Sequence, residues 1–204
     1  MPPKTNTILG FYTTGGLETD NDDEYFDYAQ IELLGNHARD AAANGDCDHI
    51  MLISRSDLNL VMNFQWYLNA SGYPATYGSI DPGGVRCSAP YPMHQFLHPE
   101  CPEGYVIDHI NRNRLDNRRE NLRIITAKQN SYNRKKPKNS KSRYKGVRQQ
   151  TKTPGNIKYK ASISKDGKTY EIKDCATEKE AALAYDAMAE ELFGIYAGKN
   201  FADS

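Results

Sequence analysis

The sequence predicts an α+β protein in which short strands are combined with a few short helices. Residues 122–125 alternate apolar and basic side chains, as a half-buried strand does. Residues 158–164 alternate in the same way and lead into Asp166-Gly167, a dipeptide that favours a tight hairpin turn. A glutamate stands three residues after Thr177, and this capping-box spacing predicts the start of a helix.

Residues 1–46 form an acidic segment with little recognisable pattern. We expect a helix over 22–43, because an acidic first turn is followed by apolar residues at helical spacing. From residue 47 onward, the expected elements are a strand over 49–54, a short helix over 57–64, a hairpin of 65–68 with 73–77, strands over 105–107 and 122–125, and a short helix from Thr126 through Arg134.

Asp108 and His109 stand side by side at the end of the expected strand 105–107. Asn130 falls in the first turn of the helix that follows, where it can converge on the same point. One carboxylate and one amide oxygen make a sparse site of hard oxygen ligands, which suits Mg²⁺ or Mn²⁺ because these ions take further ligands from water and phosphate. A neutral histidine beside such an ion can deprotonate a water molecule. These residue types predict metal-assisted hydrolysis of a phosphodiester.

The stretch around this pair resembles the HNH endonuclease family. His109 is followed by Asn121, twelve residues later, and by Asn130, twenty-one residues later, where the family often has a histidine. The resemblance implies a ββα-metal fold, with His109 as general base and with Asp108 and Asn130 as metal ligands. It also implies that Asn121 orients the loop and the histidine. The residues that fill the motif resemble the phage-type branch, which implies a homing endonuclease.

The net charge is zero, with 26 basic and 26 acidic residues, but the charges are unevenly distributed. Residues 103–160 hold 17 basic and 4 acidic residues, a net charge of +13. A block of this density indicates a nucleic-acid-binding surface, and double-stranded DNA is the partner we expect. The candidates for phosphate contacts that position the duplex are Arg112, Arg114, Arg118, Arg119, Arg123, Arg134, Lys135 and Lys136.

Residues 144–204 predict three strands and one helix, with the helix on the apolar face of the sheet. The run Tyr144-Lys145-Gly146-Val147 and the helical run 180–186 resemble the AP-two/ethylene-response-factor domain. The resemblance implies that the sheet enters the major groove of DNA. The candidates on the contact face are Arg148, Gln150, Lys160, Ser162 and Ser164. Several of them are small polar residues where that family has arginine or tryptophan, so we expect moderate sequence selectivity.

The four cysteines are widely spaced and form no Cys-x-x-Cys motif, so we expect no disulfide framework and a reducing, intracellular location. We expect no leader peptide and no membrane span, and we favour a monomer. Cys87, His94, His98 and Cys101 are possible zinc ligands. Their spacing matches no familiar zinc site, and we favour buried thiols over a structural zinc.

We interpret the chain as a metal-dependent DNA endonuclease of the HNH homing type that cuts one or both strands. The alternative is a non-catalytic, sequence-specific DNA-binding regulator that carries an inert HNH remnant. The presence of Asp108, His109 and Asn130 favours the enzyme. The expected organisation is an acidic N-terminal segment (1–46), an HNH domain (47–134, motif core 104–134), a basic linker (135–143) and a DNA-binding domain (144–204).

Overall fold

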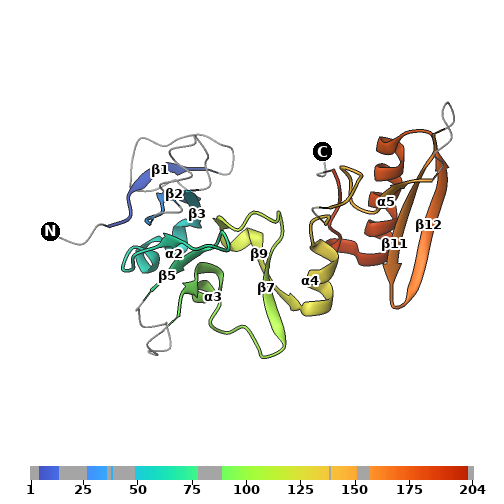
Figure 1. Cartoon of the computed structure of the whole chain (residues 1–204). Helices are drawn as coiled ribbons and strands as arrows, with labels where there is room; N and C mark the ends of the chain where they lie inside the picture. The colour runs from blue at the N-terminus through green and yellow to red at the C-terminus, as the bar shows by residue number, and fades with distance from the viewer. Residues whose placement is uncertain are drawn as a thin grey trace. The chain divides into compact units, whose positions relative to one another are not determined.

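The computed structural model describes residues 5–13, 27–35, 38, 49–77, 89–137, 139–150 and 157–201 (Figure 1). The chain divides into two compact units, Met1–Ile125 and Thr126–Ser204. Both units combine strands with helices, which confirms the predicted α+β class.

The elements of the first unit include β1 (Ile8–Tyr12), β2 (Tyr28–Glu32), β3 (Ile50–Ser54), α2 (Arg55–Val61), β4 (Tyr67–Leu68), β5 (Pro74–Thr76), β6 (Tyr91–Pro92), α3 (Met93–Leu97), β7 (Tyr105–His109), β8 (Asp116–Asn117), η1 (Arg119–Asn121) and β9 (Leu122–Thr126). Those of the second unit include α4 (Ala127–Asn133), β10 (Val147–Gln149), β11 (Tyr159–Lys165), β12 (Lys168–Cys175), α5 (Glu178–Phe193) and η2 (Gly194–Tyr196).

The largest sheet of the first unit has the strand order β1-β2-β3-β8. β2 pairs antiparallel with β1 and with β3, whereas β8 pairs parallel with β3. On β2, Ala29 and Ile31 are fully buried and alternate with half-buried residues. The predicted helix over 22–43 is therefore wrong at Tyr28–Glu32; residues 22–26, 36, 37 and 39–43 lie outside the described residues. The strand is stabilised by hydrogen bonds from partners on both sides, which a local helical pattern does not reveal.

The core of the first unit centres on Trp66, which is fully buried. Its ring packs edge-on against Phe96 with 5.2 Å between ring centroids, and its indole N–H donates to the Val61 carbonyl over 2.9 Å. Asn6 supports the same residue, because its side chain accepts a bond from the Trp66 amide at 2.8 Å and donates to the Trp66 carbonyl at 2.9 Å. A buried indole N–H needs a hydrogen-bond acceptor, and the Val61 carbonyl provides one here.

The predicted hairpin of 65–68 with 73–77 is present as the antiparallel pair β4 and β5. The predicted strand over 49–54 is present as β3. The helix α2 begins two residues before the predicted start at Asp57 and ends at Val61. β7 and β9 form a separate two-stranded sheet, and together they carry both ends of the polar loop that follows His109.

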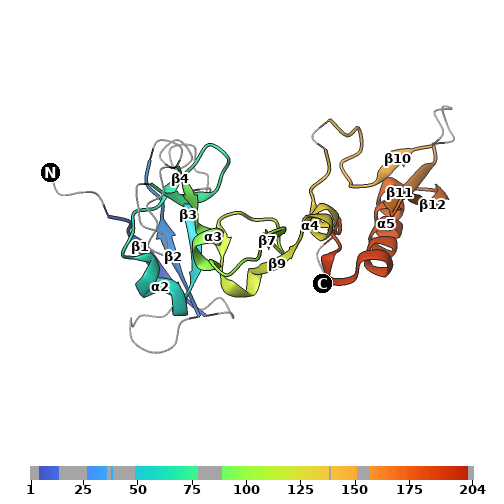
Figure 2. The ribbon, with the colours of Figure 1, turned by 90° about the horizontal axis from the view of Figure 1, so that it is seen from below.

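The C-terminal module, which we define as β10, β11, β12, α5 and η2, forms a three-stranded sheet with α5 along one face (Figures 1 and 2). The hairpin turn between β11 and β12 has positive φ at both Asp166 (51°) and Gly167 (78°), as the sequence predicts. The Thr177 hydroxyl accepts from the Glu180 amide at 3.0 Å. The Glu180 carboxylate accepts from the Ala176 amide, one residue before the expected partner of a capping box.

Helix α4 belongs to the second compact unit rather than to the first. Its N-cap is Thr126, as predicted, and the capping box with Gln129 is complete. The sequence analysis assigns this helix to the HNH domain and separates it from the C-terminal module by a polar linker. In the structure, the division between the compact units falls before α4, and Ser142, within the expected linker, is only 7% exposed.

None of the helices in the described part of the chain has the length and apolar character that a bilayer crossing requires.

Gly146 provides a test of the packing between the sheet and α5. Its φ is +71°, and an added Cβ would overlap the Tyr185 ring and lie 2.8 Å from the Ser162 carbonyl oxygen. We predict that Gly146→Ala lowers the free energy of unfolding by about 2–4 kcal/mol through overpacking and backbone strain. Gly167→Ala is the matched control, because Gly167 has φ +78° and no atom within 4 Å of the added Cβ. Its cost is about 1 kcal/mol. Urea denaturation measures both variants, and equal losses of stability would contradict the packing argument.

Candidate functional site

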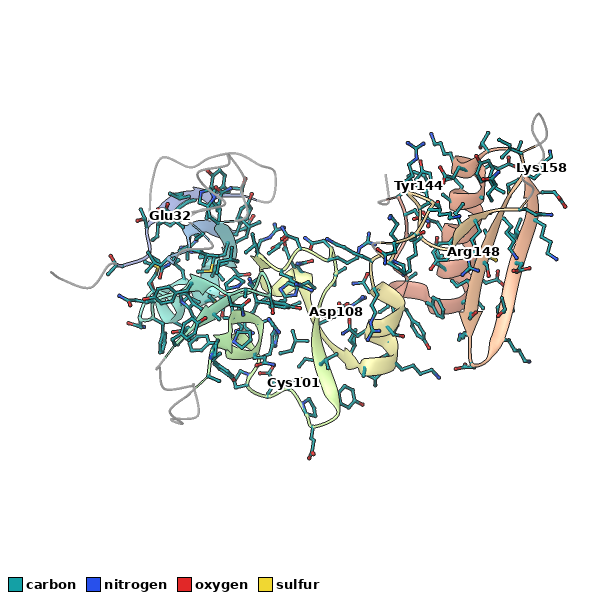
Figure 3. The ribbon with its side chains drawn as sticks, viewed as in Figure 1. Glu32, Cys101, Asp108, Tyr144, Arg148 and Lys158 are labelled. Atoms are coloured by element: carbon teal, nitrogen blue, oxygen red, sulfur yellow. The ribbon has the colours of Figure 1, made fainter. Side chains whose placement is uncertain are left out.

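The candidate site lies at the end of β7, where Asp108 and His109 are 8% and 5% exposed. Figure 3 labels Asp108 on this strand. Successive residues of a strand point to opposite faces, so the carboxylate and the imidazole have different surroundings. The two polar residues have these different surroundings because they are consecutive at the end of β7, the strand that pairs with β9.

The His109 ring is held by Asn117, with 3.2 Å between the imidazole Nε2 and the amide Oδ1. The amide of Asn117 is oriented by its own Nδ2, which donates to the Arg114 carbonyl at 3.2 Å. Oδ1 therefore faces the histidine. Because an amide oxygen can only accept a hydrogen bond, Nε2 carries the hydrogen and the neutral ring has its lone pair on Nδ1.

Asn117 is itself fixed in the core of the first unit. It is 0% exposed and lies on β8, opposite Ile53 of β3. The sequence analysis did not select this residue. Its only signal was the asparagine-rich loop, because the pairing of β8 with β3 joins segments that are far apart in the chain. The orientation of His109 thus depends on a contact that local spacing does not show.

Burial lowers the pKa of His109 below its ordinary value. The hydrogen bond that the ring donates to Asn117 and the nearby carboxylates of Asp108 and Asp116 raise the pKa, but the effect of burial is larger. The ring is therefore neutral at neutral pH and is able to accept a proton. A general base must have its lone pair available in this way.

The uncharged ring of His94 packs beside the ring of His109, with 5.3 Å between the two ring centroids. Burial is the main cause that lowers the pKa of His94 to about 4, and the neighbouring His109, His98 and Arg114 add to it. Its Nδ1 is buried and makes no hydrogen bond within the described ranges. Tyr73 contacts both histidines, with ring centroids 5.0 Å from His94 and 6.1 Å from His109. Two aromatic rings, those of His94 and Tyr73, thus pack against the candidate base.

Asp108, the predicted metal ligand, is paired with Arg123. Its Oδ2 accepts from Nε at 3.0 Å and from Nη2 at 2.8 Å. The side chain of Arg123 is only 14% exposed, so this ion pair is largely shielded from solvent. The two bonds from Arg123 orient the carboxylate beside the histidine.

Asn121 braces the loop that joins β7 to β9. Its Nδ2 donates to the Asn111 side chain at 3.0 Å and to the Asp116 carbonyl at 2.7 Å. Its Oδ1 accepts from the Asn111 amide at 2.9 Å. The sequence analysis assigns Asn121 to orienting the loop and His109. In the structure the side-chain hydrogen bond to the His109 ring comes from Asn117.

Several of the arginines predicted to contact phosphate are already bound to carboxylates. Arg118 makes two bonds of 2.8 Å to Asp116, and Arg119 binds Asp57 with Nε and Nη2 at 2.8 and 2.7 Å. The hydrogen bonds to these carboxylates raise the pKa of both guanidinium groups. A guanidinium has five N–H donors, so an ion pair of this kind still leaves donors for a phosphate.

Arg114 and Arg112 lie in the same loop. The Arg114 guanidinium stacks over the Tyr73 ring at 4.5 Å and donates to the Ser71 carbonyl. Arg112 adopts a positive φ of 62°. Arg114 therefore connects the loop to the turn between β4 and β5, in addition to bearing charge.

The remaining predicted site residues lie in the second unit. Asn130 is half-buried on α4. Arg134, Lys135, Arg148, Gln150 and Ser164 are exposed, whereas Lys136, Lys160 and Ser162 are half-buried. Lys160 is bound to Glu171 at 2.6 Å, and Gln150 exchanges bonds of 3.0 Å with Asp174. The sheet face therefore carries mixed charges and is not uniformly basic.

Two of the residues considered as zinc ligands, His98 and Cys101, contact other groups in the structure. His98 Nδ1 lies 2.8 Å from the Glu100 carboxylate, and the Cys101 thiol faces the Pro102 carbonyl at 4.0 Å. Cys87 lies outside the described residues. Where the structure describes the chain, no three histidine, cysteine or acidic side chains are grouped so as to hold a metal ion.

Comparison with known proteins places this site within a named family. A model of the HNH endonuclease family matches residues 94–132. A protein of Acanthamoeba polyphaga mimivirus, described as an uncharacterized HNH endonuclease, is 40% identical over 149 residues, which cover 71% of each chain. Protein 3.8 of Escherichia phage T7 is 31% identical over 96 residues, covering 47% of this chain and 76% of that protein. No solved structure matches.

The role of Asn117 can be tested without an activity assay. We predict that Asn117→Ala converts the His109 ring from a single Nε2–H tautomer to a mixture, because the oxygen acceptor that selects the tautomer is removed. NMR of the imidazole nitrogens at neutral pH measures this change. Asn63→Ala is the control, since the Asn63 side chain is exposed and bonds to carbonyls of the preceding helix α2. An unchanged single tautomer in Asn117→Ala would show that the bond does not control the ring.

Proposed function

We propose that this chain, which belongs to the HNH endonuclease family, is a metal-dependent endonuclease that hydrolyses phosphodiester bonds in double-stranded DNA. The observation that carries the proposal is the buried, neutral His109, whose Nε2–H is held by Asn117 beside the carboxylate of Asp108. A base and an oxygen ligand on adjacent residues supply the two functions that phosphodiester hydrolysis requires.

In the proposed reaction His109 acts through Nδ1. This nitrogen takes a proton from water, and the resulting hydroxide forms a bond to phosphorus while the bond to the departing 3′ oxygen breaks. Asn117 keeps the ring in the tautomer that leaves Nδ1 able to accept. The imidazolium formed after proton transfer is stabilised by the nearby Asp108 and Asp116, which favour the charged ring. One base activates water against one phosphodiester at a time, so the elementary event is a nick.

We propose Asp108 and Asn130 as the protein ligands of the metal ion, as the HNH resemblance implies. The oxygen of a carboxylate and the oxygen of an amide suit Mg²⁺ or Mn²⁺, which keep waters and bind substrate phosphate. When bound, the ion polarises the scissile phosphate and stabilises charge on the departing oxygen. In the structure the Asp108 carboxylate binds the Arg123 guanidinium, which shows that it can hold a positively charged group at this position.

Arg123 has a further place in this proposal. Its guanidinium neutralises Asp108 in the free protein and is only slightly exposed. With Asp108 serving as a metal ligand, the planar fork of Arg123 would be available to a phosphate oxygen, because guanidinium geometry matches phosphate. The surrounding arginines then position the duplex without reading its sequence.

We propose that the C-terminal module extends the contact with DNA and that the enzyme is of the homing type. The DNA contact is supported by a three-stranded sheet with α5 on one face, so that the opposite face carries Arg148 and Lys160. The homing type is proposed from the resemblance of the motif residues alone. A sheet of this kind can enter the major groove. The mixed charge of that face, with Lys160 bound to Glu171, favours moderate rather than tight sequence readout.

Cleavage of supercoiled plasmid tests the enzyme against the inert DNA-binding alternative. We predict nicking in Mg²⁺ or Mn²⁺ that stops when EDTA removes the metal. We also predict that His109→Ala lowers the cleavage rate by about 100-fold or more, the scale of general-base catalysis, while DNA affinity stays close to wild type. Cleavage assays and gel-shift titrations measure the two quantities.

His49→Ala is the matched control, because His49 lies just before β3 and outside the candidate site. It should cleave like the wild type. DNA binding without metal-dependent cleavage in the wild-type chain would favour the inert alternative. Equal loss of cleavage and of DNA affinity in His109→Ala would show that the residue is structural rather than a base.

A further inference from the structure

Tyr73 is fixed at the end of the turn between β4 and β5, and Asn69 makes most of the bonds that hold it. The Asn69 side-chain oxygen accepts from the Ser71 amide at 2.9 Å and from the Tyr73 amide at 3.0 Å. The Asn69 amide donates to the Tyr73 carbonyl at 2.9 Å, and its carbonyl accepts from the Gly72 amide at 2.8 Å. Gly72 has a φ of 75°, which a glycine adopts without strain. Because Pro74, the next residue, is fully buried, the backbone of Tyr73 has little freedom.

The half-buried ring of Tyr73 contacts three groups of the candidate site. The guanidinium carbon of Arg114 lies 4.5 Å from the centroid of the ring. The ring centroids of His94 and His109 lie 5.0 Å and 6.1 Å from it. All four residues belong to the first compact unit. One aromatic side chain therefore connects an arginine to the candidate base.

The Arg114 guanidinium is held at two points of the same turn. It stacks on the Tyr73 ring, and its Nη1 donates to the Ser71 carbonyl. Arginine suits such a stack because its guanidinium is planar and more weakly hydrated than an ammonium group. A guanidinium has five N–H donors, so most of them remain for a ligand. The turn thus fixes the plane of the guanidinium and leaves it able to bind an anion.

Arg114 also differs from its neighbours in the balance of charge. Arg118, Arg119 and Arg123 each bind an aspartate, whereas none of the ion pairs between described residues involves Arg114. After burial and two neighbouring histidines, the charge of Arg114 adds to the lowering of the pKa of His94, so the guanidinium is close to the histidine pair. A cation beside a general base disfavours protonation of that base. An anion bound to the guanidinium removes this penalty, and phosphate matches its geometry.

We infer that Tyr73 is a positioning residue of the nuclease site, which holds the Arg114 guanidinium where it binds a non-bridging oxygen of the scissile phosphate beside His109. The inference rests on the proposed function, in which His109 activates the attacking water. Arg114 then stabilises the negative charge on the phosphate as hydroxide adds to phosphorus. Tyr73 acts through Arg114 and does not touch the substrate. It lies outside residues 94–132, so this contact is not part of the stretch that matches the family model.

The test compares single-turnover cleavage rates of full-length variants at saturating protein, because these rates separate chemistry from binding. We expect Arg114→Ala to lower the rate about 100-fold, the scale for loss of one preorganised donor to the transition state. We expect Tyr73→Leu to lower it about tenfold, because a displacement of about 1 Å removes much of the effect of a positioned group. DNA affinity in gel shifts should change by much less, since Arg114 is one of many basic residues in the block 103–160.

Two variants separate positioning from general loss of stability. Tyr73→Phe keeps the ring that carries the guanidinium and should cleave like the wild type. Tyr67→Leu removes another half-buried ring from the same hairpin, since Tyr67 lies on β4 opposite Ala75 and packs against Tyr77 with 5.7 Å between ring centroids. It should keep the wild-type rate at temperatures where it is folded. A loss in Tyr67→Leu equal to that in Tyr73→Leu overturns the inference, because the effect is then a general one.

A double-mutant cycle measures whether Tyr73 acts through Arg114. In the Arg114→Ala background, Tyr73→Leu should lower the rate by less than about twofold, because no guanidinium is left for the ring to hold. His109 keeps its bond to Asn117 in both backgrounds. A tenfold loss that persists in the double variant shows that the ring acts independently of Arg114 and overturns the inference.

The failure of this inference is distinct from the failure of the proposed function. A wild-type chain that does not cleave DNA with any divalent ion overturns the proposed function and this inference with it. A wild-type chain that cleaves, together with an Arg114→Ala or a Tyr73→Leu variant of unchanged rate, overturns the inference alone.

Discussion

The arrangement of the site depends on the parallel pairing of β8 with β3. This pairing consists of Leu52 opposite Asp116 and Ile53 opposite Asn117, and both residues of β8 are 1% exposed or less. This pairing fixes the middle of the polar loop that joins β7 to β9. Asn117 then reaches the His109 ring, and Asp116 accepts from the Asn111 side chain at 2.7 Å. Without this short strand Asn117 would not be fixed beside the histidine, and the acceptor that selects the tautomer of the ring would be lost.

A second constraint is the internal neutralisation of the basic block. Its high positive charge indicates a nucleic-acid partner, yet Arg118, Arg119 and Arg123 are all bound to buried aspartates. In the shielded pair of Arg123 with Asp108, removal of one partner costs about 3–5 kcal/mol, because it leaves an uncompensated charge. The side chain of Arg119 is 46% exposed, so its pair with Asp57 contributes less. These arginines therefore hold the loop as well as supplying charge.

The local parts of the fold could be predicted from the sequence, and the non-local parts could not. The turn at Asp166, the caps at Thr126 and Thr177 and the spacing from His109 to Asn121 all follow from residues close together in the chain. The strand β2 was taken for a helix because its stability comes from two distant partners. In the same way Asn117 and the stack of Tyr132 on Phe193 depend on contacts that join distant segments. Sequence spacing thus identified the candidate base but not the residues that hold it.

The measurement that tests the account most directly is the location of Mn²⁺ by anomalous diffraction in crystals of His109→Ala bound to uncut DNA. The account places the ion at the carboxylate of Asp108, at the ligand distance of about 2.1 Å that such small divalent ions require. It also places a phosphate oxygen on the ion and separates Arg123 from the carboxylate oxygen that it now contacts. An ion bound only by other residues, with the Asp108–Arg123 pair intact beside the DNA, would contradict the account.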